Sequence, residues 1–218
     1  MLASYTFNSN YTPGHTQHQP LPSLRLLEGG KFRPGQFSPV LVKEYNQIRL
    51  KYFQWGMVPA WTKGSKKEKS RRFVASDHLV RQPGFQIALR RQRCLIPADG
   101  YYLSTGKTYN KQNFKIHANG GDTFCFAGIY DTWRNADGSL LQSFAILTTE
   151  SDADMRQFGL QMPLILPKKW EGLWLNPNAN MQKIYDVLKQ PYPVSLQIYP
   201  IQELKEMDLI GFYEHVAA

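Results

Sequence analysis

The chain has 218 residues, which is enough for one sizeable hydrophobic core, so we expect one domain rather than two. An apolar content of 42%, with 12 Tyr, 12 Phe and 5 Trp, indicates a folded protein. The formal net charge of +9 favours an anionic partner, with nucleic acid first and a membrane surface second. No segment approaches the roughly 18 consecutive apolar residues of a membrane span, which excludes a helical membrane protein.

The N-terminal segment, residues 1–22, is polar and rich in proline and histidine, so we expect a weakly structured, flexible arm ahead of a single domain over 23–218. It has no cationic region followed by an apolar run, so no signal peptide is predicted and we expect a cytoplasmic protein. Cys94 and Cys125 lie in apolar, strand-like runs, and we interpret them as buried thiols rather than a disulfide framework.

The first half of the domain predicts strands followed by a helix. Apolar residues within Pro39–Phe53 indicate one or two strands, and Lys63–Arg72 reads as an exposed charged loop. A helix is predicted over Asp77–Arg91, with Asp77 as its N-cap, and Pro83-Gly84 must break or kink it.

The second half is dominated by short strands separated by Gly, Asn and Asp turns, and these strands are predicted at Arg93–Ile96, Tyr101–Ser104, Asn113–His117, Thr123–Trp133 and Leu140–Thr148. Helices are predicted at Ser151–Phe158, Pro167–Leu175 and Asn180–Lys189, followed by a last strand at Val194–Pro200. Strands outnumber helices and are mixed with them, so the predicted class is α+β.

Two tryptophans flank a rigid turn in the segment Gln54–Trp61. Gly56 and Pro59 favour a turn that displays Trp55 and Trp61, either as a stacking platform for unpaired bases or as core residues. Stacking on an aromatic ring contributes about 1–3 kcal/mol per base.

Basic side chains gather in two runs. They are phosphate-contact candidates, with a solvated surface as the alternative, and comprise Lys66, Lys67, Lys69, Arg71 and Arg72 in the first run and Arg90 and Arg91 in the second.

Several segments together resemble the SRAP family, whose members capture abasic sites in single-stranded DNA through an N-terminal cysteine. The segments are QWGMVPAW (54–61), FVASDH (73–78), CLIPADGYYL (94–103), FAGIYDTW (126–133), LTTESD (147–152) and FGLQMPLIL (158–166). The resemblance covers roughly residues 30–200. It implies an α+β fold in which a twisted mixed β-sheet curls toward a barrel, with short flanking helices. It also implies one core Trp and one partly exposed Trp in the first segment.

The same resemblance implies that the catalytic residues of the family are replaced. The family's cysteine falls at Leu2, its asparagine at Val74, its glutamate at Leu103 and its histidine at Gly159. Its phosphate-binding arginine falls at Ser76.

The consequence of Leu2 is chemical. In the family, the free α-amine, with a pKa of about 8, attacks the sugar aldehyde, and the thiol then closes a thiazolidine ring. Leucine has no thiol, and a bulky second residue predicts that Met1 is retained. We therefore expect a dry pocket in which Val74 and Leu103 are buried near Gly159. No cofactor or metal is predicted.

Three functions stay open at this point. The first is a catalytically degenerate SRAP-like protein that retains single-stranded or abasic-site DNA binding in a DNA-damage (SOS) context. The second is an active abasic-site crosslinking protein or peptidase. The third is a protein-interaction scaffold whose groove is filled by Val74, Leu103 and Leu160 packed together.

Overall fold

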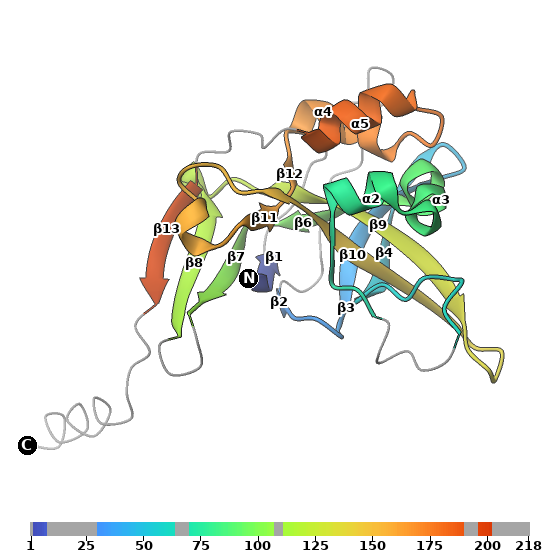
Figure 1. Cartoon of the computed structure of the whole chain (residues 1–218), viewed down its shortest axis with the longest axis horizontal. Helices are drawn as coiled ribbons and strands as arrows, with labels where there is room; N and C mark the ends of the chain where they lie inside the picture. Colours follow the sequence, from blue (N-terminus) through green and yellow to red (C-terminus); the bar gives the residue numbers. More distant parts are fainter. Residues whose placement is uncertain (1, 8–29, 64–69, 107–110, 190–195, 202–218) are drawn as a thin grey trace, which may run out of the picture.

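The computed structural model describes residues 2–7, 30–63, 70–106, 111–189 and 196–201. Within them the chain forms two β-sheets and a group of short helices (Figure 1). One sheet has five strands in the order β13 (Leu196–Ile201), β8 (Gln112–Ala118), β7 (Gly100–Thr105), β1 (Leu2–Phe7) and β2 (Gly30–Phe32). All four strand pairs of this sheet are antiparallel.

The second sheet closes on itself. Its ring consists of β3 (Phe37–Glu44), β4 (Gln47–Trp55), β6 (Arg93–Ala98), β9 (Phe124–Arg134) and β10 (Leu140–Glu150). The ring closes because β10 pairs antiparallel with β9 and parallel with β4. The short strands β5 (Phe73–Ala75), β11 (Gln161–Pro163) and β12 (Ile165–Leu166) extend it. The prediction of an α+β protein whose mixed sheet curls into a barrel is confirmed.

The helices lie together on one side of the barrel (Figure 1). They are α2 (Ser76–Arg81), α3 (Pro83–Arg91), α4 (Lys168–Leu175) and α5 (Met181–Lys189). Apart from this group, the described residues form two 3-10 turns, at Asn119–Gly121 and Arg156–Phe158. Pro83 separates α2 from α3, as predicted, because it cannot continue the preceding helix. The predicted cap was wrong: α2 begins after Ala75, and Asp77 lies inside its first turn.

Successive side chains of the barrel strands point to opposite faces of the sheet, so they contribute to two separate core layers. Val40, Ile96 and Phe144 pack toward the five-stranded sheet. Their chain neighbours Leu41 and Leu95 pack on the opposite face, under the helices. The five-stranded sheet and the helices therefore cover opposite faces of the barrel.

A buried arginine ties the ends of two helices together. Arg93 is 4% exposed, and its guanidinium donates to the carbonyl oxygens of Leu89, Arg90, Trp174 and Asn176. These carbonyls belong to the C-terminal ends of α3 and α4, where helix carbonyls lack partners within their own helix. Burial lowers the pKa of Arg93 to about 10, so the group stays charged at neutral pH.

Two sequence predictions are corrected by the chain path. Residues 2–7 of the expected flexible arm form strand β1, which lies between β7 and β2, because Tyr5 and Phe7 are buried; residues 8–22 lie outside the described part of the chain. Ser151–Phe158 is not a helix. Asp152 accepts a hydrogen bond from the Met155 backbone at 2.8 Å, which favours a turn, and only Arg156–Phe158 is helical, as one 3-10 turn.

Candidate functional site

The N-terminal strand directs residue 2 inward. β1 pairs with β7 so that Leu2 lies opposite Leu103, and a β-bulge shifts the register between Leu2 and Ser4. Because of this extra residue, Leu2 and Tyr5 both reach the same core layer although they are three positions apart. The bulge thus aims the second side chain of the protein into the molecule rather than toward solvent.

The side chain of Leu2 lines a pocket of about 360 Å³, which we call the apolar pocket. It is lined by Leu2, Phe73, Leu103, Thr148, Met155, Phe158, Gly159, Leu160, Gln161 and Pro163. None of these side chains titrates, and the hydrogen bond from Thr148 Oγ1 to Gln161 Oε1, at 2.7 Å, joins its two most polar members. The lining therefore offers neither a nucleophile nor a general acid or base.

The backbone at the rim of the apolar pocket requires glycine. Gly159 has φ of 152°, within the region that L-residues rarely adopt. It follows the 3-10 turn at Arg156–Phe158 and lies just before β11. A Cβ atom here would have room, since its nearest neighbour would be the Gln161 carbonyl oxygen at 4.0 Å, but any side chain would strain the backbone.

A second hollow adjoins Leu2 on its other side, and we call it the arginine hollow. It has a volume of about 840 Å³ and is lined by Leu2, Ala3, Arg33, Pro34, Gly35, Gln54, Trp55, Gly56, Ser70 and Arg72. Arg33 and Arg72 are both exposed, and the lining contains no carboxylate. The arginine hollow therefore presents a positive surface next to residue 2.

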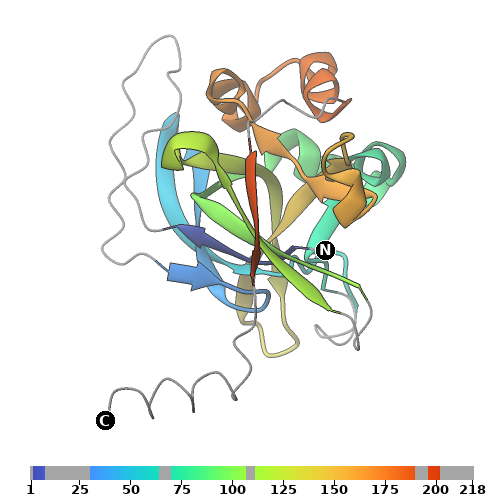
Figure 2. The ribbon, with the colours of Figure 1, turned by 90° about the vertical axis from the view of Figure 1, so that its left-hand side faces the viewer.

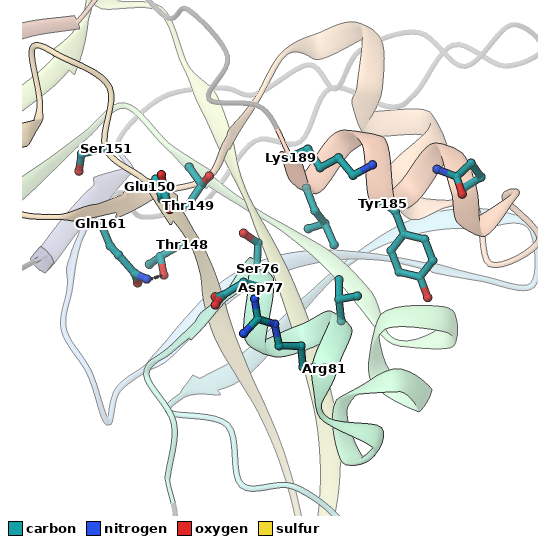
Figure 3. Close-up of a pocket in the computed structure, with 13 residues that line it drawn as sticks. Ser76, Asp77, Arg81, Thr148, Thr149, Glu150, Ser151, Gln161, Tyr185 and Lys189 are labelled. Atoms are coloured by element: carbon teal, nitrogen blue, oxygen red, sulfur yellow. Dashed lines mark hydrogen bonds between the residues drawn. The ribbon is translucent and has the colours of Figure 1, made fainter.

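A third hollow, which we call the polar hollow, continues from the apolar pocket (Figure 3). The two share Thr148 and Gln161. The polar hollow measures about 660 Å³, and its lining comprises Ser76, Asp77, Val80, Arg81, Thr148, Thr149, Glu150, Ser151, Gln161, Gln182, Tyr185, Leu188 and Lys189. Arg81 projects from α2 and Lys189 from α5, on different sides of the hollow. The apolar pocket thus adjoins the arginine hollow at Leu2 and the polar hollow at Thr148 and Gln161, and we call this series of hollows the path through Leu2.

Comparison with known proteins decides the family. A family model described as SOS response associated peptidase (SRAP) matches residues 25–205. The chain belongs to the SRAP family. Abasic site processing protein YoqW of Bacillus subtilis (strain 168) is 29% identical over 173 residues, which cover 78% of this chain and 77% of that protein. Abasic site processing protein HMCES of Xenopus tropicalis is 25% identical over 228 residues, covering 83% and 64%.

Solved structures show the same SRAP fold. A protein from Bacteroides thetaiotaomicron superposes with a TM-score of 0.70 at 24% identity, covering 79% of this chain and 78% of its own. A protein from Bordetella bronchiseptica superposes with a TM-score of 0.73 at 23% identity, covering 92% and 100%.

Three of the four positions predicted as replaced SRAP catalytic residues meet in one place. Leu2, Leu103 and Gly159 all line the apolar pocket, as expected. Val74 does not line it: although buried, Val74 pairs with Leu147 of β10 and packs in the core layer under the helices. Its chain neighbour Phe73 lines the pocket instead.

The filled groove proposed from the SRAP resemblance is absent. Leu160 is 78% exposed, and Val74 and Leu103 belong to different core layers. The three side chains therefore do not pack together, and the apolar pocket stays open.

The two tryptophans differ in solvent exposure, as the SRAP resemblance implied. Trp55 is 0% exposed, so the prediction that it stacks on bases is wrong; its Nε1 donates to the Arg72 carbonyl oxygen at 3.1 Å. Trp61 is 50% exposed and contacts the edge of Phe85, with ring centroids 5.5 Å apart. It lines none of the three hollows.

The predicted cationic residues are only partly brought to this path. Arg72 lines the arginine hollow, whereas Arg90 and Arg91, at the end of α3, line none of the three hollows. Arg71 is exposed and its backbone bridges Met57. Lys66, Lys67 and Lys69 lie outside the described residues.

Sequence reasoning missed three cations that line these hollows. Arg33 precedes a Pro-Gly turn that could have marked it, while Arg81 and Lys189 are scattered helix residues whose meeting depends on tertiary packing. No short-range pattern joins residues about a hundred positions apart.

No alternative nucleophile or metal centre appears among the described side chains. Cys94 and Cys125 are fully buried thiols, as predicted, and burial raises the pKa of the Cys94 thiol, which keeps it unreactive. The described residues contain no group of three His, Cys, Asp or Glu that could hold a metal ion. Among them, no helix is long and apolar enough to cross a membrane.

Proposed function

We propose that this SRAP-family protein binds single-stranded DNA, including strands with an abasic site, in a DNA-damage (SOS) setting, and does not form the family's covalent adduct. The observation that carries this proposal is the pairing of Leu2 with Leu103 in a pocket without titratable side chains. A pocket of this size can hold a deoxyribose that lacks its base, but its lining cannot move the protons that the chemistry needs.

Binding is supported by the surroundings of the apolar pocket. The arginine hollow presents Arg33 and Arg72 without a carboxylate, whereas the polar hollow presents Arg81 and Lys189 together with Asp77 and Glu150. The arginines of the arginine hollow match a phosphate next to a nucleotide placed at Leu2, and Arg81 and Lys189 add cations within reach of the strand beyond the apolar pocket. The net charge of +9 adds a long-range attraction for any nucleic acid.

The alternative is an active crosslinking protein, and the names of its relatives favour it. Several curated relatives are called abasic site processing proteins. For this chain, that activity would need a thiol that Leu2 lacks, so any covalent product would have to be an imine of the N-terminal amine.

One experiment with two readouts separates these functions. A fluorescent single-stranded oligonucleotide with one abasic site is mixed with the protein, and anisotropy is followed across a salt titration. The same mixture is then denatured and run on a gel, with and without borohydride to trap imines. We expect salt-sensitive binding and no denaturation-resistant band. A band at stoichiometric yield without borohydride would establish the active alternative, and absence of binding at low salt would refute DNA binding.

A further inference from the structure

The five-stranded sheet has an outward surface on the side away from the barrel, and Figure 2 views the molecule from the side on which its edge strand β13 lies. Successive side chains of a strand point to opposite faces. Ile116 and Tyr101 point inward and are fully buried, so their neighbours Lys115, His117 and Tyr102 point outward. We call this surface the outer face.

Aromatic and cationic side chains alternate across the outer face. The strand register places Lys115 of β8 between Tyr102 of β7 and Tyr199 of β13. The ammonium of Lys31 on β2 lies 3.7 Å from the centre of the Tyr102 ring. The imidazole of His117 is stacked on Tyr199, with centroids 5.3 Å apart and planes 6° apart. These five residues form a continuous band over four strands.

The band is both accessible and uniformly charged. Lys31, Lys115 and Tyr199 are exposed, and Tyr102 and His117 are partly exposed. The other outward positions of the described strands carry no carboxylate; they are Asn113, Ser104, Gly100, Ser4, Thr6, Gln197 and Ile201, of which Ser4 and Gly100 are buried. Asp99, directly before β7, accepts a hydrogen bond from Thr6 at 2.6 Å, but the two exposed lysines of the band outnumber this carboxylate, so the face is complementary to a polyanion.

A glycine occupies the middle of the outer face, on β7. Gly100 lies opposite His117 on one side and Thr6 on the other. A Cβ atom at this position would come within 3.0 Å of the Ile116 carbonyl oxygen and 3.5 Å of the His117 Cβ. Glycine therefore lets Thr6 and His117 approach each other across β7, and Gly100 itself is buried between them.

Cross-strand pairs also stabilise sheets, which gives a purely structural account of each contact taken alone. That account explains neither the exposure of Tyr199 nor the lack of carboxylates over five strands. None of the five band residues lines the arginine hollow, the apolar pocket or the polar hollow. The band is thus a surface distinct from the path through Leu2.

We propose that the outer face is a second binding surface, which takes an unpaired nucleic-acid strand by stacking bases on Tyr199 and Tyr102 and holding phosphates with Lys31 and Lys115. Open β-sheets that carry aromatic residues among basic ones bind single strands in this manner, because every base has a face to stack and every nucleotide carries a phosphate. Lys31 would exchange the Tyr102 ring for a phosphate when a base arrives. This inference does not depend on the function proposed for the path through Leu2.

The test uses the full-length protein and three double variants. The first is Tyr102→Leu with Tyr199→Leu, and the second is Lys31→Ala with Lys115→Ala. The matched control, Lys168→Ala with Lys183→Ala, removes two exposed lysines from α4 and α5 on the helical side of the molecule. Anisotropy measures the affinity for fluorescent oligothymidylate and oligouridylate, and thermal unfolding confirms that each variant is folded. Ultraviolet crosslinking followed by peptide mapping shows where the strand lies.

We expect about a tenfold loss of affinity for each tyrosine removed, a reduced salt dependence for the lysine variant, and little change for the control. Crosslinked peptides should contain Tyr102 or Tyr199. The two oligonucleotides distinguish a DNA-selective from an RNA-selective surface. Crosslinks confined to peptides with Arg33 or Arg72, with unchanged affinity of both outer-face variants, would overturn this inference and leave the proposed function intact. If the tyrosine variant loses stability, the lysine variant, at two exposed positions, decides.

Discussion

Leu2 of β1 and Leu103 of β7 are direct partners across an antiparallel strand pair, and both side chains line the apolar pocket. In the SRAP family these positions are expected to hold the nucleophile and a carboxylate. In this protein the two positions form one contacting pair of leucines. Each leucine fits the other, and restoring one polar group would place it against an apolar partner.

The first prediction concerns Leu2→Cys. The variant supplies a thiol at the inward-facing end of β1, yet the surrounding lining still has no acid or base. We expect slow crosslinking to an abasic site. The yield should stay far below stoichiometric when the variant is incubated for the same time as the wild-type protein. Groups that act together lose most of their effect when only one is present. The measurement is the gel assay for a denaturation-resistant adduct, with Leu2→Ser as the matched variant without a thiol. Full, rapid crosslinking by the single variant would show that the other replaced positions never mattered.

The second prediction concerns Leu103→Glu. Leu103 is buried opposite Leu2, so the new carboxylate would lie in an apolar environment that raises its pKa. A carboxyl group whose pKa is raised on folding binds its proton more tightly in the folded state, so stability falls as pH rises above the unfolded-state pKa of about 4.3. We expect the free energy of unfolding to drop more at about pH 7.5 than at about pH 4.5. Urea denaturation at both values measures this.

Leu103→Gln is the control for this pH effect. It buries a polar group of similar size that does not titrate, so its loss of stability should be nearly the same at the two pH values. Equal behaviour of the Glu and Gln variants would mean that the pocket is wetter than its lining indicates.

The third prediction concerns Gly159. Because its φ of 152° lies where side chains are strained, Gly159→His and Gly159→Ala should each cost about 1–3 kcal/mol of stability. Gly30→Ala is the control: this glycine lacks a positive φ, and a Cβ there would meet Phe32 at an ordinary 3.5 Å. The control should be neutral or slightly stabilising. If Gly159→Ala is equally tolerated, the loop adopts another backbone conformation, and a histidine could be accommodated there.

Local patterns in the sequence anticipated the barrel strands and most helices, because alternation and proline positions act within a few residues. They failed at residues 2–7, where a polar-looking arm begins with LASYTF. The burial of Tyr5 there depends on Trp55 and Phe126, ring neighbours at 5.4 and 6.0 Å from distant strands. No short stretch of sequence around Tyr5 shows that these distant rings will bury it.

The site was anticipated only where strand register fixed it. The motif segments placed Leu103 and Gly159 at one pocket, and the position directly after Met1 placed Leu2 there. It failed for Val74, since a three-residue strand gives no signal for which alternate side chain faces the pocket and which faces the helices. Trp55 shows the same limit: its aromatic character suited both stacking and core, and tertiary packing decided.

The fourth prediction concerns Arg93, which links the ends of α3 and α4. Arg93→Met keeps most of the side-chain length but leaves four carbonyl oxygens without their donor. Unsatisfied buried groups are costly, so we expect a loss of about 3 kcal/mol or more. Chemical denaturation measures it, with Arg91→Met, at an exposed position of α3, as the control expected to change little. A small effect for Arg93→Met would mean that water replaces the guanidinium.

The fifth prediction concerns the two arginines beside Leu2. Arg33 and Arg72 line one hollow, while Arg90 and Arg91 are equally exposed but lie away from it, at the end of α3. The double variants Arg33→Gln/Arg72→Gln and Arg90→Gln/Arg91→Gln therefore remove the same charge from different places. Each phosphate contact to a single strand contributes about 0.7 to the slope of log affinity against log salt, so the first variant should lower that slope by about 1.4.

The second double variant should leave that slope nearly unchanged and reduce affinity only through the weaker overall field. Anisotropy with a single-stranded oligonucleotide at four or more salt concentrations gives both slopes, and neither substitution touches the backbone carbonyl of Arg72 that accepts from Trp55. Equal slopes for the two variants would mean that net charge alone attracts DNA. A larger effect of Arg90 and Arg91 would place the strand along α3, beside the exposed ring of Trp61, and would move the binding path away from Leu2.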